Sequence, residues 1–321
     1  MILSLFAGAL ITAIAGATPA PAAAELAANA AKPGTLTDLT PAFIAFADET
    51  AAMPDAARVT AFHDRFDPLL PGYYNDKGAS QARFDTMIAF GLKSFPAIRA
   101  KFSTTATSFA AAFARGQQHF RATFPDYRLT VPVYLVHSMS QQDGGTRTIA
   151  GRTVLMFGAD MIATLHDETT IGAFLDHELF HVYHQRAFGD CPQIWCSLWQ
   201  EGLATYAASR LNPGVSDRAL LLTVPRPIRP AVEPRLAEAM CAVRAKFYST
   251  APGDYAPLFS FGGNGPFPPR YGYYVGYVLA QKLGEKIPLQ RLAKLRPAAV
   301  KPLLLAAIDG YGPCAAPAAK P

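Results

Sequence analysis

The pattern of hydrophobic and polar residues divides the chain into a helical first part, a short strand-forming stretch and a second helical part. From Leu39 to about Phe124, apolar residues recur at helical spacing. Prolines interrupt the pattern at Pro54, within 68–71 and at Pro96. Because a proline inside a helical pattern usually ends the helix, we expect about four or five helices in this part.

Two runs of apolar and β-branched residues follow, at 129–136 and 153–158. Each run predicts a short strand. The polar segment 141–146 between them is typical of a turn. The two strands therefore predict a small antiparallel sheet.

Two further helices are predicted after the strands. Asp167 is a good N-cap for the first, whose apolar positions recur until Gly189. The second begins near Leu198 and runs to about Leu211, before the Asn-Pro-Gly sequence at 212–214. Together the elements predict an α+β fold that is mostly helical, with the small sheet beside the first of these two helices.

The composition is typical of a folded protein. Of the 321 residues, 50% are hydrophobic and only 17% are charged, against about a quarter in an average protein. The formal net charge is +5, with several cations near the C-terminus. These cations lack the aromatic stacking residues and motifs that nucleic-acid binding needs, so we expect a solvated helix face and no nucleic-acid partner.

The N-terminus is typical of an exported protein. Residues 1–24 carry no charged side chain, and an apolar run up to Gly16 is followed by small residues before Glu25. We expect a signal peptide over 1–24 and a flexible leader over 25–38, which predicts a periplasmic or secreted protein. The basic residues that usually begin a signal are missing, so an uncleaved N-terminal membrane anchor is the alternative. After signal cleavage, the sequence predicts no stable membrane span.

Four cysteines lie in the exported part, an even number that suits an oxidising compartment: Cys191, Cys196, Cys241 and Cys314. They allow three pairings. The short separation of Cys191 and Cys196 makes a local disulfide plausible, which would leave Cys241 to pair with Cys314. No pair has the C-x-x-C spacing of zinc ribbons or thioredoxin-like sites, which disfavours metal or redox roles.

The chemistry is concentrated in the sequence His-Glu-Leu-Phe-His at 177–181. His177 and His181 lie four residues apart on one helical face, so both imidazoles can reach a single metal ion. Glu178 projects near the position of a metal-bound water. Nineteen residues separate His181 from Glu201, which lies on the second helix. Two imidazoles and one carboxylate leave the fourth position of a zinc ion open for water, which is the catalytic arrangement.

At these residues the chain resembles the gluzincin metallopeptidases of the thermolysin and aminopeptidase N type. The resemblance rests on His-Glu-Leu-Phe-His followed by Leu-Trp-Gln-Glu-Gly-Leu-Ala-Thr-Tyr at 198–206, and it covers residues 131–279. The chain is also similar to a bacterial group of predicted secreted zinc proteases. The resemblance implies one Zn²⁺ per chain, held by His177, His181 and Glu201, with Glu178 as the catalytic base.

A later segment adds candidate groups for the transition state. Arg270, Tyr273 and Tyr274 lie at the entry to another apolar helix. Gluzincins of the aminopeptidase kind carry a tyrosine after the third ligand that hydrogen-bonds the oxyanion, which implies Tyr273 or Tyr274 in this chain. A phenol or a guanidinium aimed at developing negative charge suits that task. Helix packing is the alternative explanation of these aromatic residues.

The chain departs from the family pattern in two places. Thermolysin-like enzymes place an aspartate one turn after the glutamate ligand to orient a zinc histidine, whereas this chain has Thr205. That orientation would have to come from Asp176 or a backbone carbonyl. The motif that captures a substrate amino terminus in aminopeptidase N relatives is not recognisable near 157–161, so aminopeptidase activity is disfavoured. His184 lies about 10 Å along the helix from His177, too far to bind the same ion.

We therefore expect an enzyme, a secreted or periplasmic zinc metallopeptidase that hydrolyses a peptide or protein substrate. Strand 153–158 would form the cleft edge along which an extended peptide adds. The expected regions are an N-terminal helical region at 39–125 and a metallopeptidase region at 126–321, or one continuous domain, and the first region could instead act as a prosegment. Two alternatives stay open: a non-catalytic zinc-binding or scaffold protein with the same helix pair, and a structural helical protein in which the motif is accidental.

Overall fold

A computed structural model describes residues 32–75, 78 and 80–314. The predicted signal peptide and the first part of the predicted leader lie outside the described residues. Helices dominate and one four-stranded sheet accompanies them, which confirms the α+β prediction. In chain order the elements are β1 (Leu36–Asp38), α2 (Thr40–Glu49), α3 (Asp55–Phe66), α4 (Gln81–Thr123), β2 (Val133–Val136), β3 (Gly144–Ile149), β4 (Arg152–Gly158), α5 (Ala159–Leu165), α6 (Ile171–Phe188), α7 (Ile194–Leu211), α8 (Arg229–Val232), η1 (Glu233–Arg235), α9 (Leu236–Ala245), α10 (Pro252–Phe259), α11 (Tyr271–Gly284), α12 (Leu289–Leu292) and α13 (Pro297–Asp309).

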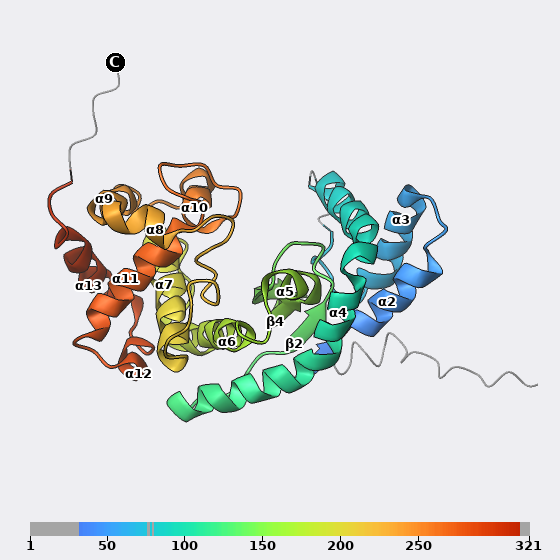
Figure 1. Cartoon of the computed structure of the whole chain (residues 1–321), viewed down its shortest axis with the longest axis horizontal. Helices are drawn as coiled ribbons and strands as arrows, with labels where there is room; N and C mark the ends of the chain where they lie inside the picture. The colour runs from blue at the N-terminus through green and yellow to red at the C-terminus, as the bar shows by residue number, and fades with distance from the viewer. Residues whose placement is uncertain (1–31, 76–77, 79, 315–321) are drawn as a thin grey trace, which may run out of the picture.

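The N-terminal region forms fewer and longer helices than its sequence predicts. Its described residues form α2, α3 and α4, and Pro96 lies inside α4 instead of ending a helix. Figure 1 shows the two halves of α4 running in different directions, as an internal proline allows. Phe95 and Phe102, on either side of Pro96, are both buried. Burial of these rings offsets the backbone hydrogen bond that the proline removes.

The sheet is mixed, with the strand order β1-β2-β4-β3. β1 and β4 pair with β2 in parallel, whereas β3 pairs with β4 antiparallel. The prediction that 129–136 and 153–158 pair antiparallel is therefore wrong. The polar segment 141–146, which we expected to be a turn, contains the start of β3. The β3–β4 hairpin closes at Ala150 and Gly151, both with positive φ, and β4 then pairs with β2 on its other side.

Part of the expected flexible leader also belongs to the sheet. Residues Leu36–Asp38 form β1, which pairs in register with β2, Leu36 opposite Val133. The strand has three residues, so it carries too little alternation to be recognised in the sequence.

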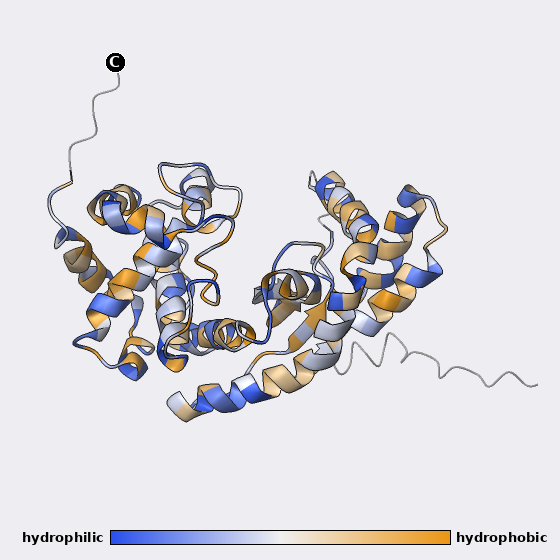
Figure 2. Cartoon of the chain, viewed as in Figure 1, coloured by the Kyte–Doolittle hydropathy of each residue, from blue (hydrophilic) through white to orange (hydrophobic). Residues whose placement is uncertain are grey.

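The N-terminal helices and the sheet share one hydrophobic core. Phe43 and Phe95 pack on His137, which follows β2, with ring centroids 4.2 Å and 5.8 Å from the imidazole. Phe109 of α4 packs on Phe157 of β4 at 4.9 Å. Figure 2 shows the visible strands mostly in the orange of hydrophobic residues. Helices α2–α4 are therefore built into the fold that carries the later elements, an arrangement that argues against a separable prosegment.

The later helices are arranged around α7 and α11. A Cβ atom at Gly202 of α7 would lie 2.1 Å from the backbone carbon of Gly276 in α11. The two helix backbones therefore touch, because neither position carries a side chain. This contact places Glu201, beside Gly202, and Tyr273, one turn before Gly276, on neighbouring helices.

Both disulfides have the pairing that the spacing favoured. Cys191 pairs with Cys196, and Cys241 pairs with Cys314. The first links the α6–α7 connection to α7, and the second ties the chain after α13 to α9. Within the described part of the chain, none of the helices has the length and apolar character needed to cross a membrane.

Candidate metal centre and cleft

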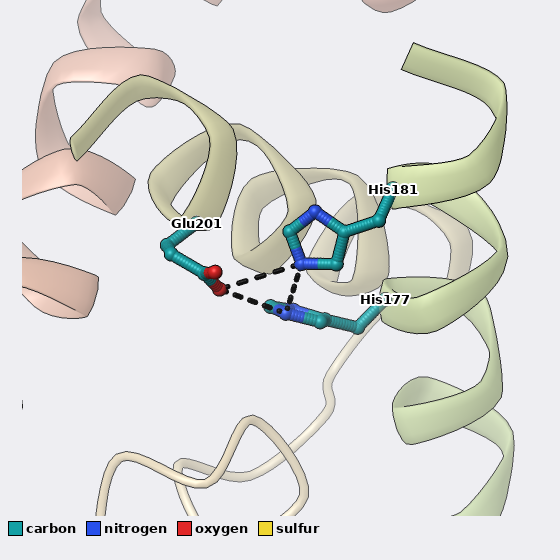
Figure 3. Close-up of side chains that lie close together, drawn as sticks. All are labelled: His177, His181 and Glu201. Carbon is teal, nitrogen blue, oxygen red and sulfur yellow. Dashed lines mark hydrogen bonds and ion pairs between the residues drawn. The ribbon is translucent and has the colours of Figure 1, made fainter. Parts of the chain in front are cut away.

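His177, His181 and Glu201 come together in one cluster, as the sequence predicts. The Nε2 atoms of His177 and His181 lie 3.0 Å apart, and Oε2 of Glu201 lies 3.3 Å from each of them. Figure 3 shows the two imidazoles projecting from one helix toward the carboxylate on another. One donor atom from each residue fits within 4.8 Å of the others, so the group could bind a metal ion.

Helices α6 and α7 form an antiparallel hairpin that holds this cluster. Gln200 donates a hydrogen bond to Gln185 near the connected ends of the two helices, at 3.1 Å. At the far ends, Asn212 donates to Asp176 at 2.7 Å. Gly189 ends α6 with a φ of 71°, a conformation that glycine adopts without strain. The short connection brings Glu201 back beside the two histidines.

The charges in the cluster stabilise one another. Burial disfavours an ionised Glu201, but His181 and His177 outweigh this effect and hold the pKa of Glu201 below its usual range. Burial likewise opposes a charged His181, yet the charge and hydrogen bond of Glu201 raise its pKa to about 9. Burial lowers the pKa of His177. The glutamate therefore stays anionic, which is the form that binds a metal cation.

Glu178 lies in a tightly enclosed place beside the cluster. Glu178 is buried, and its Oε2 atom has no hydrogen-bond partner among the described residues. Burial raises the pKa of Glu178 to about 8. A Cβ at Gly144 would lie 2.7 Å from Cγ of Glu178 and 2.9 Å from the ring of Phe174. Because Gly144 has no side chain, the Glu178 side chain can occupy this space.

The buried His166 and the partly buried Asp143 form a pair that supports the strand covering Glu178. His166 Nε2 lies 3.0 Å from Oδ2 of Asp143, and Oδ1 accepts the backbone N–H of Gly144 at 3.0 Å. The His166 ring packs 4.2 Å from that of Phe174. No sequence motif marks this pair, because its members lie 23 positions apart in the chain.

Tyr273 and Arg270 both reach the cleft beside the cluster. The Tyr273 ring is nearly parallel to that of His177, with centroids 6.3 Å apart. The Arg270 guanidinium lies 4.3 Å from the centre of the Tyr273 ring, and Nη1 donates to the carbonyls of Leu221 and Val224. Arg270 is therefore held in place by backbone carbonyls and supports the tyrosine from one side.

Tyr274 does not reach the cluster. It is buried, packs against Tyr277, and has the guanidinium of Arg229 4.9 Å from its ring centre. Consecutive helical residues point about 100° apart, so only one of the two tyrosines can face the metal centre. Tyr274 therefore does not occupy the oxyanion position that the sequence left open to it.

Two other sequence candidates have partners away from the cluster. Oδ2 of Asp176 lies 3.1 Å from Nδ1 of His119 and accepts the amide of Asn212, so this oxygen does not orient a zinc histidine. His184 bonds the carbonyl of Ala293 through Nδ1 at 2.8 Å, which agrees with its exclusion as a ligand.

The cluster opens into a cleft of about 1220 Å³. One wall is the strand β3 with the residues that precede it, and another carries three aromatic side chains from α10 and the following loop: Tyr255, Phe259 and Phe261. β3 is the edge strand and β4 lies inside the sheet. The expectation that 153–158 forms the cleft edge is thus corrected, because β3 covers that side of β4.

Comparison of the chain with protein-family models, curated proteins and solved structures gave no significant match.

Proposed function

We propose that the protein is a zinc-dependent peptidase. The observation that carries the proposal is the cluster of His177, His181 and Glu201 beside an enclosed carboxylate, Glu178, at the base of a large cleft. A structural zinc site usually has four protein ligands, whereas three ligands beside a cleft leave a position for water. The donor set of two imidazoles and one carboxylate suits Zn²⁺.

Zinc bound there would act as a Lewis acid on the peptide carbonyl and lower the pKa of its water toward about 7. The positive charge of a bound zinc ion would oppose the effect of burial and favour the ionised form of Glu178. In that form Glu178 would take the proton of the attacking water and pass it to the leaving amine. Its enclosure by Gly144 and Phe174 supports this role, because it limits the positions that the carboxylate can adopt.

Tyr273 is the group best placed to stabilise the oxyanion. Burial raises its pKa well above the ordinary value, so the phenol keeps its proton at neutral pH and can donate a hydrogen bond. Arg270 holds the ring from the side and is a positioning residue in this mechanism. A neutral donor aimed at the carbonyl oxygen gains strength as negative charge develops there.

The two disulfides are consistent with an oxidising compartment. They support the proposal of an exported enzyme, either periplasmic or secreted. An N-terminal anchor is the alternative if the signal is not cleaved.

Metal content and peptide cleavage test the proposal together. We expect about one zinc per chain in the wild type by elemental mass spectrometry, with cleavage of a broad library of unfolded peptides. Glu201→Ala should lose most of the zinc, because it removes one of three ligands. Glu178→Gln should keep the zinc and lose cleavage, since the amide cannot accept the proton.

The matched control is Glu168→Ala, which removes an exposed carboxylate near the start of α6 and should change neither property. Undiminished cleavage by Glu178→Gln would contradict the mechanism. Zinc binding without cleavage by the wild type would favour the non-catalytic zinc-binding alternative.

A further inference from the structure

The charged side chains that line the cleft differ in how many hydrogen bonds and ion pairs they form within the protein. Asp143 is hydrogen-bonded to His166, and Asp190 accepts a hydrogen bond from Gln185 at 2.8 Å. The remaining acids of the lining are the proposed base and the third metal ligand. The arginines Arg83 and Arg147 also line the cleft, and neither makes an ion pair with any described residue. Their guanidiniums therefore have no carboxylate partner in the described part of the chain.

Arg147 is the better placed of the two. It lies on the edge strand β3, three residues after Gly144, the glycine that faces Glu178. A Cβ built on Gly145 would lie 3.4 Å from Nη1 of Arg147. Residues two apart share one face of a strand, so the guanidinium lies back along the face of β3 that carries Gly145, beside the strand segment that covers Glu178.

The hydrogen-bonding capacity of Arg147 is mostly unused. Nη1 donates to the carbonyl of Thr146, and no other hydrogen bond from this side chain is formed within the described part of the chain. A guanidinium has five N–H donors in a planar fork that matches a carboxylate. Its charge also reaches the opposite wall: burial raises the pKa of Tyr255, and the positive charge of Arg147 opposes that rise.

Resting on the proposed peptidase function, we propose that Arg147 binds a carboxylate of the peptide substrate beside the scissile bond. The enzyme then prefers peptides with an acidic side chain or a free C-terminal carboxylate close to the cleavage site. Arg147 is a specificity-determining residue in this inference.

Matched peptides test the preference. Four versions of one cleaved sequence would be compared by kcat/KM: Glu or Gln next to the scissile bond, each with a free or an amidated C-terminus. We expect the wild type to favour a carboxylate-bearing version by about tenfold, the value of one charge-assisted hydrogen bond. Added salt should reduce this preference, because screening weakens the ion pair.

The variant Arg147→Gln should remove the preference and leave the fully neutral peptide cleaved at a similar rate. The control Arg152→Gln removes the same charge from the same hairpin, at an exposed position outside the cleft lining, and should keep the preference. A preference that follows the Glu side chain identifies an internal acidic residue as the ligand. A preference that disappears on amidation identifies the C-terminus.

Other outcomes separate this inference from the proposed function. Cleavage of all four peptides at equal rates, or an equal effect of both arginine variants, overturns the role of Arg147 and leaves the peptidase intact. If the wild type cleaves none of them, the peptidase proposal fails, and binding of the same labelled peptides to the wild type decides the carboxylate site. Tighter binding of a carboxylate version that Arg147→Gln abolishes supports the site, and equal binding rejects it.

Discussion

Tyr273 and Tyr274 are neighbours in the chain, but they have different surroundings. Tyr273 lies in the cleft beside His177, whereas Tyr274 is buried against Arg229 and Tyr277. A single residue step around the helix separates a candidate catalytic group from a packing group. The two tyrosines therefore allow a catalytic role and a packing role to be compared directly.

We expect Tyr273→Phe to lower kcat by about 100-fold with little change in zinc content, because it removes one donor to the oxyanion. Tyr274→Phe serves as the control and should retain a rate within a few fold of the wild type. Steady-state kinetics on a cleaved peptide, with metal analysis of each variant, would check both. Equal rates for Tyr273→Phe and the wild type would remove Tyr273 from the mechanism.

At the element scale, the close approach of α7 and α11 is what relates Glu201 to Tyr273. A Cβ at Gly276 would lie 2.2 Å from the carbonyl oxygen of Leu198 and 2.8 Å from Cα of Gly202. Backbone atoms of a packed helix cannot give way as a flexible side chain can. Any side chain at this position must push the two helices apart.

Gly276→Ala should therefore lower the free energy of unfolding by about 3 kcal/mol, and activity should fall with it. Chemical denaturation would measure the change. Gly253→Ala is the matched control, because a Cβ at Gly253 in α10 meets nothing within 4 Å. This control should be neutral or slightly stabilising, since alanine favours helices over glycine. Wild-type stability of Gly276→Ala would show that the helix contact is looser than described.

At the scale of the whole molecule, His137 lies where the N-terminal helices meet the sheet. Its ring packs against Phe43, Phe95 and Phe102, and Asp160 is the charged group that faces it, 3.6 Å from Nδ1. Burial lowers the pKa of His137 below 6.5, and the charge of Asp160 opposes the shift only in part. The imidazole is therefore neutral in the folded core at a pH where it is already charged in the unfolded chain.

Buried His137 makes the free energy of unfolding depend on pH, because the folded and unfolded states bind different numbers of protons. Between pH 6.5 and the lower pKa of the folded state, the unfolded chain binds one more proton at this position, so acid destabilises the fold. In this window the wild type should lose about 1.4 kcal/mol per pH unit relative to His137→Phe. Denaturation of both proteins at several pH values would measure the difference. Parallel pH profiles of the two proteins would contradict the neutral buried histidine.

Local signals were enough to predict several features from the sequence. The spacing of His177, Glu178 and His181 places them on one helical face whatever surrounds the helix, and a short connection then returns Glu201 to them. The separation of Cys191 and Cys196 similarly favours the local disulfide. Helical periodicity and β-branched runs indicated the α+β class, because they reflect which residues are buried in each element.

Only the tertiary structure decided the features that depend on contacts between distant segments. The position of β3 at the sheet edge is hidden in the sequence because both faces of most of this strand are partly exposed, so its residues do not alternate. Pro96 stays within α4 because burial of the flanking rings outweighs its local cost. Packing between elements likewise decides that Tyr273, and not Tyr274, lies beside His177. It also brings Asp143 and His166 together. These contacts depend on how whole elements are oriented in space, which short-range spacing along the chain does not encode.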